Sequence, residues 1–159
     1  RLSTPRIDLL GLGMLASEPG DAASLAIAGA ELEGDGDQIA GESVSEQQDR
    51  PLRLMLAHRP EAMMTGSDLG MDLVIAGHTH GGQCRLPGGK ALVNASTFPT
   101  SMSAGLFRHR NTLAVVTRGA GEITLPLRTF CRAHVPLYTL RPRPLPGTAG
   151  QAIHLLKRW

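Results

Sequence analysis

The feature of this sequence that most limits its fold is a pair of short apolar runs with a helical stretch between them. Residues 52–57 read Leu-Arg-Leu-Met-Leu-Ala, and residues 72–76 read Asp-Leu-Val-Ile-Ala. Both runs are typical of buried β-strands. Pro60 suits the first turn of a short helix between them, which we expect Gly66 and Gly70 to break. The arrangement predicts a βαβ unit with parallel strands, and therefore an α/β fold.

The remaining elements are shorter. We expect a strand at 6–12 and a helix over 22–32 that Asp21 caps. Residues 31–50 are acidic and rich in Gly, Ser and Gln, which indicates a flexible insert at the surface. The second half predicts a β-rich and partly antiparallel region, with strands at 91–94, 112–117, 123–127 and 135–140. The last residues, 152–159, are expected to form a short helix.

Composition and charge fit one globular unit with an uneven surface. The chain has 159 residues, of which 42% are hydrophobic and 19% are charged, enough for one sizeable core. Residues 1–80 contain 13 Asp and Glu against 5 Arg, a net charge of −8, whereas residues 81–159 contain 11 Lys and Arg against Glu122 alone, a net charge of +10. This asymmetry suggests that the second half faces an anion. No run approaches the about 18 apolar residues of a membrane span, and two cysteines do not make a disulfide framework.

Three histidines carry the strongest chemical signal. His58 follows the first apolar strand, and His78 and His80 follow the second. Ligands bind at the carboxyl edge of open α/β sheets, so all three imidazoles are expected at one site. Neutral imidazole is a ligand for Zn, Mn and Fe, and the surrounding glycines permit a tight turn. The sequence therefore predicts a metal site that uses His58, His78 and His80.

Several other residues are weaker candidates. Cys84 could join the three histidines in a mononuclear zinc site, although a small packed residue is the better interpretation. Arg118 follows an apolar run and is a candidate for contact with a substrate phosphate. Residues 108–110, Arg-His-Arg, form a basic cluster that is expected in an exposed turn. Met63 and Met64 are expected to pack the short helix against the sheet.

These motifs together resemble the calcineurin-like metallophosphoesterases. The likeness covers roughly residues 50–140 and is greatest to the bacterial branch with a Gly-His-Thr-His-Gly-Gly-Gln signature. It rests on Leu56-Ala57-His58-Arg59-Pro60-Glu61 and on Gly77-His78-Thr79-His80-Gly81-Gly82-Gln83. Arg118-Gly-Ala-Gly121, Pro126-Leu-Arg128 and a terminal strand ending Tyr138-Thr-Leu140 also fit this branch.

The resemblance implies a four-layer α/β sandwich with two divalent metal ions, Mn, Zn or Fe, at the edge of the sheet. His58 and His78 would bind one ion and His80 the other. The family's Asp-x-His, Gly-Asp-x-x-Asp and Gly-Asn-His motifs are absent from this sequence. The resemblance therefore implies the C-terminal half of such a domain over residues 1–140, with a C-terminal extension over 141–159. The missing N-terminal half would be its partner.

The expected function is metal-dependent hydrolysis of a phosphoester, with a phosphorylated substrate. The isolated chain is expected to be inactive or weakly metal-binding, because three neutral imidazoles do not compensate the charge of two divalent ions. The alternative is a non-catalytic metal-binding or regulatory module. Nucleic acid is not an expected partner, since aromatic residues for base stacking make up only 3%. The expected location is the cytoplasm or the periphery of the inner membrane, with peripheral membrane association.

Overall fold

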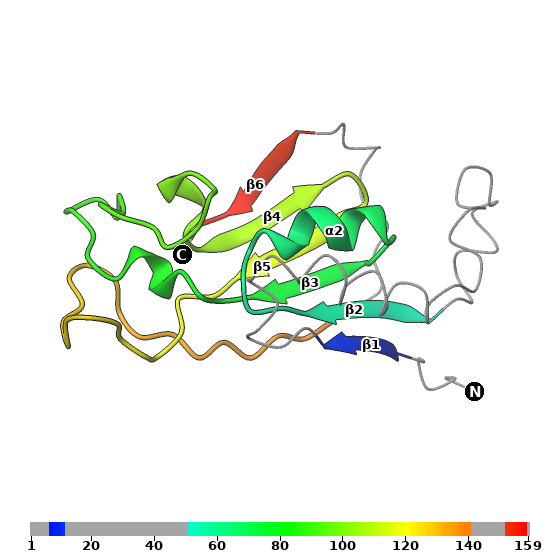
Figure 1. The fold of residues 1–159 in the computed structure, drawn as a ribbon, viewed down its shortest axis with the longest axis horizontal. Coiled ribbons are helices and arrows are strands. Elements are labelled where there is room, and N and C mark those ends of the chain that lie inside the picture. The colour runs from blue at the N-terminus through cyan, green and yellow to red at the C-terminus, as the bar shows by residue number, and fades with distance from the viewer. Residues whose placement is uncertain (1–6, 12–50, 141–151, 159) are drawn as a thin grey trace.

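A computed structural model describes residues 7–11, 51–140 and 152–158 of the protein. These residues form a six-stranded sheet in the order β1-β2-β3-β5-β4-β6 (Figure 1). The strands are β1 (Ile7–Gly11), β2 (Leu52–Leu56), β3 (Leu73–Ala76), β4 (Gly105–His109), β5 (Thr112–Val116) and β6 (Ile153–Lys157). The α/β class and the mixed sheet predicted from the sequence are confirmed.

Four neighbouring strands run parallel and set the carboxyl edge of the sheet. β1, β2, β3 and β5 pair in parallel, with Leu54 opposite Leu73 and Val74 opposite Ala114. β4 is antiparallel to both β5 and β6, so Gly105 at its start lies opposite Val116 at the end of β5. The chain therefore leaves β3 and enters β4 at the same edge, and everything between these strands belongs to that edge.

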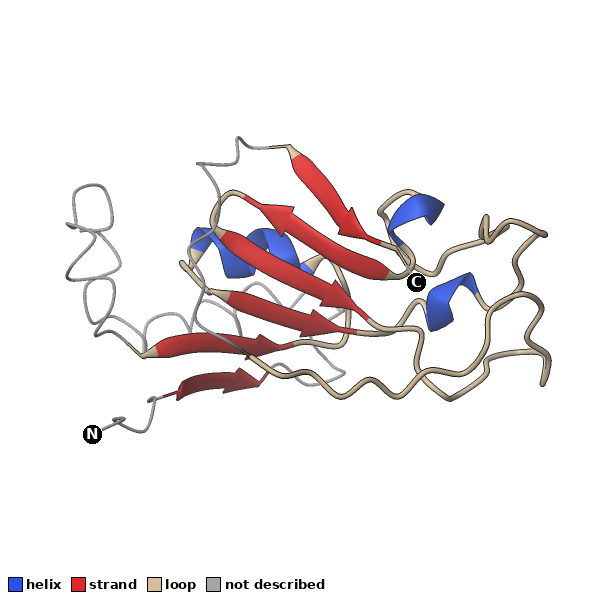
Figure 2. Ribbon diagram, turned by 180° about the vertical axis from the view of Figure 1, so that it is seen from behind, coloured by secondary structure: helices blue, strands red, loops and turns tan. Residues whose placement is uncertain are grey.

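The helix α2 (Ala62–Asp68) covers one face of the sheet (Figures 1 and 2). Its Met63 joins a buried cluster with Met55, Val74 and Phe107, which alternate with residues of the opposite face as strand geometry requires. Gly66 does not break the helix as predicted. It lies inside α2, where an added Cβ would come within 2.5 Å of Val74 Cγ2, so the helix can lie this close to β3 only because a side chain is missing.

Gly70 and the two methionines of α2 were also predicted from the sequence. Gly70, with a φ of 65°, follows the helix end and accounts for the stop. Met63 packs against the sheet as predicted, but the prediction for Met64 was wrong because this residue is 38% exposed and lies outside the buried cluster.

An extended segment without regular strands, residues 117–140, crosses part of the opposite face of the sheet. In Figure 2, which views the sheet from behind, this segment passes in front of the lower strands. Residues 134–138 lie over Leu106 and Val115, with which they line a cavity of about 570 Å³. A single bridge between Gly119 and His134 joins the two arms of the segment.

Several predicted elements were wrong. Residues 91–94 contribute only an isolated bridge at Ala91, and 123–127 and 135–140 form no strand. The alternating apolar residues at 123–127 mimic a strand, but Leu125 and Leu127 donate their backbone N–H to carbonyls two residues earlier, which makes tight turns.

Two strands were misread in the sequence. The predicted helix at 152–159 is the strand β6, which pairs with β4. β4 itself was missed, because Arg108 and His109 interrupt its apolar pattern. The predicted helix at 22–32, its cap Asp21 and the insert at 31–50 lie outside the described residues. The division at residue 140 stays a prediction. Among the described residues, no helix is long and apolar enough to cross a membrane.

Candidate metal and phosphate site

Three chemistry-bearing residues stand at the same distance beyond three adjacent parallel strands. His58, His78 and Arg118 each lie two residues after the last residue of β2, β3 and β5. The backbone ladder continues past the strand ends, since Gly77 N donates to His58 O at 3.1 Å and Thr117 N donates to Ala76 O at 2.8 Å. Sheet hydrogen bonding therefore fixes where these side chains leave the backbone.

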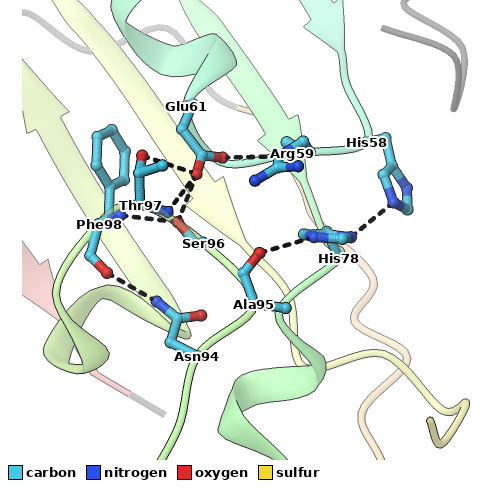
Figure 3. A network of polar contacts seen from close by, with 9 residues as sticks. All are labelled: His58, Arg59, Glu61, His78, Asn94, Ala95, Ser96, Thr97 and Phe98. Atoms are coloured by element: carbon cyan, nitrogen blue, oxygen red, sulfur yellow. Dashed lines mark hydrogen bonds and ion pairs between the residues drawn. The ribbon is translucent and has the colours of Figure 1, made fainter. Parts of the chain in front are cut away.

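His58 and His78 face each other directly (Figure 3). His58 Nε2 and His78 Nδ1 are 2.8 Å apart, and the ring centroids are 4.6 Å apart in an edge-on arrangement. His78 Nε2 lies 2.8 Å from Ala95 O. A carbonyl only accepts, so His78 carries its proton on Nε2, and its Nδ1 then accepts from His58 Nε2. The sheet edge thus brings together two imidazoles, one with its far nitrogen held by a backbone carbonyl.

The surroundings favour the neutral form of His58. Burial lowers the pKa of His58, and nearby positive charge at His78, Arg59 and His80 lowers it further. Neutral imidazole is the form that ligates a metal. A lowered pKa therefore favours metal binding, because His58 does not first have to lose the proton of its charged form.

His80 points elsewhere, although only one residue separates it from His78. Its Nδ1 lies 2.9 Å from Gly121 O. By the same argument Nδ1 carries the proton, which leaves the lone pair on Nε2. His78 and His80 therefore have opposite tautomers. Metal-bound histidines commonly have their second nitrogen held by a carbonyl, and both residues show that arrangement.

The turn that carries these residues is strained. His78 and His80 have φ values of 66° and 50°, in the left-handed region where non-glycine residues are rare. Each such residue costs about 1–3 kcal/mol, which surrounding contacts must offset. Thr79 separates the two histidines with an ordinary φ of −69°. The alternation sends the two imidazoles to different carbonyls, Ala95 O and Gly121 O.

Buried hydrogen bonds offset this strain. The Thr79 hydroxyl donates to Ser103 O at 2.6 Å and accepts from Gly81 N at 3.2 Å. Gly81 O in turn accepts from Ser103 Oγ at 3.2 Å and from Arg85 Nε at 2.7 Å. Gly81 itself has a φ of 67°, and an added Cβ would lie 2.5 Å from Arg118 Cγ, so only glycine fits here.

Glu61 holds the loop that orients His78 (Figure 3). Its Oε1 accepts from Ser96 Oγ at 2.9 Å, Thr97 N at 2.7 Å and Thr97 Oγ1 at 3.0 Å. Burial alone would raise the pKa of Glu61, but these hydrogen bonds, with those from its own amide and Arg59, outweigh burial and lower the pKa to about 2. Ala95, whose carbonyl accepts from His78, precedes this anchored pair. Sequence reasoning missed Glu61 as a site residue, and its position beside Pro60 at the helix start was the only available signal.

The structure also places the weaker candidates from the sequence, which are Cys84, Arg118 and residues 108–110. Cys84 Sγ lies 3.9 Å from Leu127 O. Arg118 packs its stem against Gly81, and its Nε is buried without a hydrogen-bond partner. The prediction of an exposed basic turn at 108–110 was wrong. Arg108 and His109 are buried in β4, and Arg110 pairs with Asp68 at 2.6 Å.

The donor set of the described residues fits part of a metal site. Nowhere in residues 7–11, 51–140 and 152–158 do three His, Cys, Asp or Glu side chains come together as one group able to hold a metal ion. The zinc site of three histidines and Cys84 is therefore not assembled in this structure. His58 with His78 offers two imidazole donors, and His80 offers a third at a separate position. Within the part of the chain that the structure describes, no carboxylate joins them to balance a divalent charge.

Comparison with known proteins identifies relatives that are named as a metallophosphoesterase and a phosphodiesterase. The chain is 30% identical over 99 residues to "Uncharacterized metallophosphoesterase YkuE" of Bacillus subtilis (strain 168), a match that covers 62% of this chain and 34% of the relative. It is 36% identical over 116 residues to "Phosphodiesterase YaeI" of Escherichia coli (strain K12), covering 69% of this chain and 41% of the relative. The chain thus spans between a third and a half of the length of these curated relatives. No protein-family model and no solved structure matches it.

Proposed function

We propose that this chain is part of a calcineurin-like metallophosphoesterase and contributes His58, His78 and His80 as metal ligands. The observation that carries the proposal is the 2.8 Å contact between His58 Nε2 and His78 Nδ1 at the carboxyl edge of two parallel strands. Names of the relatives support phosphoester hydrolysis, and the α/β fold is consistent with part of such a domain. The Gly-His-Thr-His-Gly-Gly-Gln turn, residues 77–83, is the signature on which we base the branch.

Each residue has a distinct part in this proposal. Bound divalent metal ions would polarise the phosphate and lower the pKa of a bound water. His78, oriented by Ala95 O, would present its unprotonated Nδ1 to one ion, and His58 would ligate the same ion after its Nε2 loses the proton that it donates to His78. His80 would present Nε2 to the other. The Arg118 guanidinium, whose buried Nε is unpaired in this structure, would contact a phosphate oxygen.

The proposal also requires ligands that the described residues do not supply. Two divalent ions need carboxylates or other anionic ligands to balance their charge. The relatives extend well beyond the matched region, since more than half of each lies outside it. We infer that the remaining ligands come from a complementary segment of the same domain. The substrate class is a phosphorylated compound, and a location in the cytoplasm or at the inner membrane stays a prediction.

The test uses the protein encoded by the complete reading frame that contains this sequence. Metal content is measured by inductively coupled plasma mass spectrometry, and hydrolysis is followed with p-nitrophenyl phosphate and bis(p-nitrophenyl) phosphate. His78→Ala should lose a metal ion and lower hydrolysis by at least about 100-fold, because a ligand matters more than the groups that orient it. His154→Ala is the matched control, since His154 is exposed on β6.

The outcomes separate the two functional hypotheses. Unchanged metal content in His78→Ala would contradict the assignment of the ligands. Stoichiometric metal binding without hydrolysis of either phosphate ester would instead support a non-catalytic metal-binding or regulatory module.

A further inference from the structure

The carbonyl that orients His80 belongs to a segment that the sheet does not hold. Gly121 lies in the extended stretch 117–140, which has no strand of its own. Gly121 O is nevertheless placed 2.9 Å from His80 Nδ1. A mobile carbonyl could not select one tautomer of a histidine, so other contacts must fix this part of the chain.

Arg128 supplies most of those contacts. Its Nη2 donates to Gly121 O, the acceptor that His80 uses, and to Arg118 O at 3.1 Å. Its Nη1 donates to His80 O at 3.2 Å and to Cys131 O at 3.3 Å. One planar guanidinium thus links the backbone of His80 with the carbonyl that orients the imidazole of His80. A lysine ammonium is a point donor and cannot span these carbonyls in the same way.

Gln83 anchors the same segment from the other side. Its Nε2 donates to Ile123 O at 3.1 Å and to Leu125 O at 2.8 Å, and its Oε1 accepts from Ile123 N at 2.9 Å. The side chain is buried, and its amide satisfies backbone groups that would otherwise pair in a strand. Gln83 therefore fixes the stretch just after Gly121, while Arg128 fixes Gly121 itself.

We propose that Arg128 is a positioning residue that fixes the orientation and tautomer of His80 by holding Gly121 O, with Gln83 as a second anchor. The relevance of this to catalysis rests on the proposed function, in which His80 binds metal through Nε2. The positioning itself is a property of the metal-free protein. His78 provides an internal reference, because its opposite tautomer is set by Ala95 O on a different loop.

The direct test is the tautomer of His78 and of His80 in the metal-free form of the protein encoded by the complete reading frame that contains this sequence. Long-range ¹H–¹⁵N correlation spectra distinguish a protonated from an unprotonated ring nitrogen, and about pH 8 keeps ordinary histidines neutral. The wild-type chain should show Nδ1–H for His80 and Nε2–H for His78. In Arg128→Met, His80 should shift toward Nε2–H, the form that a histidine without a partner favours, while His78 stays unchanged.

Matched variants separate positioning from general destabilisation. Arg132→Gln removes an exposed arginine from the same segment and should leave both tautomers as in the wild type. If Arg128→Met does not fold, Arg128→Lys and Gln83→Leu give the same test, each removing part of the network and shifting His80 partially. An unchanged His80 tautomer in folded Arg128 and Gln83 variants would overturn the proposal.

A metal titration links the inference to function. In the protein encoded by the complete reading frame, the metal site that includes His80 should bind Zn²⁺ about 10–100-fold more weakly in Arg128→Met. Losses of this size are typical when a group that orients a metal ligand is removed. The ion assigned to His58 and His78 should be retained. If the wild type binds no metal but Arg128→Met still moves the His80 tautomer, the proposed function fails and the positioning role stands.

Discussion

The sheet with its helix and the segment 117–140 hold the two parts of the candidate site by different means. β2, β3 and β5 form a continuous backbone ladder over a core in which Phe107 is 1% exposed. Segment 117–140 forms no strand and leaves most of its apolar side chains exposed, with Leu125 58% exposed, although Cys131 is buried. Its backbone is held by the side chains of Gln83 and Arg128, together with isolated backbone bridges at Thr129 and His134. The His58–His78 pair thus depends on the fold as a whole, whereas His80 depends on two polar side chains.

The largest effect should come from the core. Phe107→Ala removes a buried ring between α2 and the sheet, and should lower the free energy of unfolding by about 3–5 kcal/mol. Urea denaturation followed by circular dichroism measures this loss. Leu125→Ala in segment 117–140 is the control and should change stability by less than about 0.5 kcal/mol, because its side chain is already in water. If Phe107→Ala and Leu125→Ala lower the free energy of unfolding equally, segment 117–140 contributes to the core in the same way as the sheet, contrary to this comparison.

The turn between the regions should show an intermediate effect. Thr79→Val leaves Ser103 O and the Gly81 N–H without their buried partner, which costs about 1–3 kcal/mol. The same urea titration measures it. Thr139→Val, at an exposed position, is the matched control and should remain near the wild type. If Thr79→Val is as stable as that control, the hydroxyl does not support the strained turn.

The stabilising contribution of Glu61 depends on pH. Its pKa is lowered from 4.5 to about 2, so its stabilising contribution is present above pH 4.5 and is lost as the pH falls toward 2. Glu61→Gln should be less stable than the wild type at neutral pH by roughly 1 kcal/mol, a low value because the carboxylate is partly exposed. The difference should shrink toward zero near pH 2. The exposed Glu122→Gln is the control, and a difference that does not depend on pH would contradict this role.

The parts of the fold set by local sequence were predictable, and those set by distant contacts were not. The strands at 52–57, 72–76 and 112–117 were found because continuous apolar runs of this length are typical of strands in a parallel sheet. β4 was missed because Arg108 and His109 are polar residues that only tertiary packing buries. β6 was misread as a helix since five residues carry little periodicity.

The residues of the candidate site also divide into those predictable from local sequence and those that depend on distant contacts. His58 and His78 could be placed together from their positions after two parallel strands. That His80 diverges could not, because it depends on positive φ at two non-glycine residues and on Gly121, 41 residues further along the chain. Glu61 and its partners at 96 and 97 are likewise joined only by the fold. Arg128 is part of the Pro126-Leu-Arg128 run on which the predicted resemblance rests, but its role could be inferred only from the positions of the carbonyls that it bonds.

The antiparallel direction of β4 has a consequence for how this molecule can change over evolution. Because β3 ends and β4 begins at one edge of the sheet, residues 77–104 leave that edge and return to it without crossing a strand. They carry His78, His80 and the carbonyl of Ala95. Such an excursion can be lengthened, shortened or exchanged between homologues as a cassette while strand order and register stay the same. The chemistry of this edge is thereby free to diversify on an unchanged sheet.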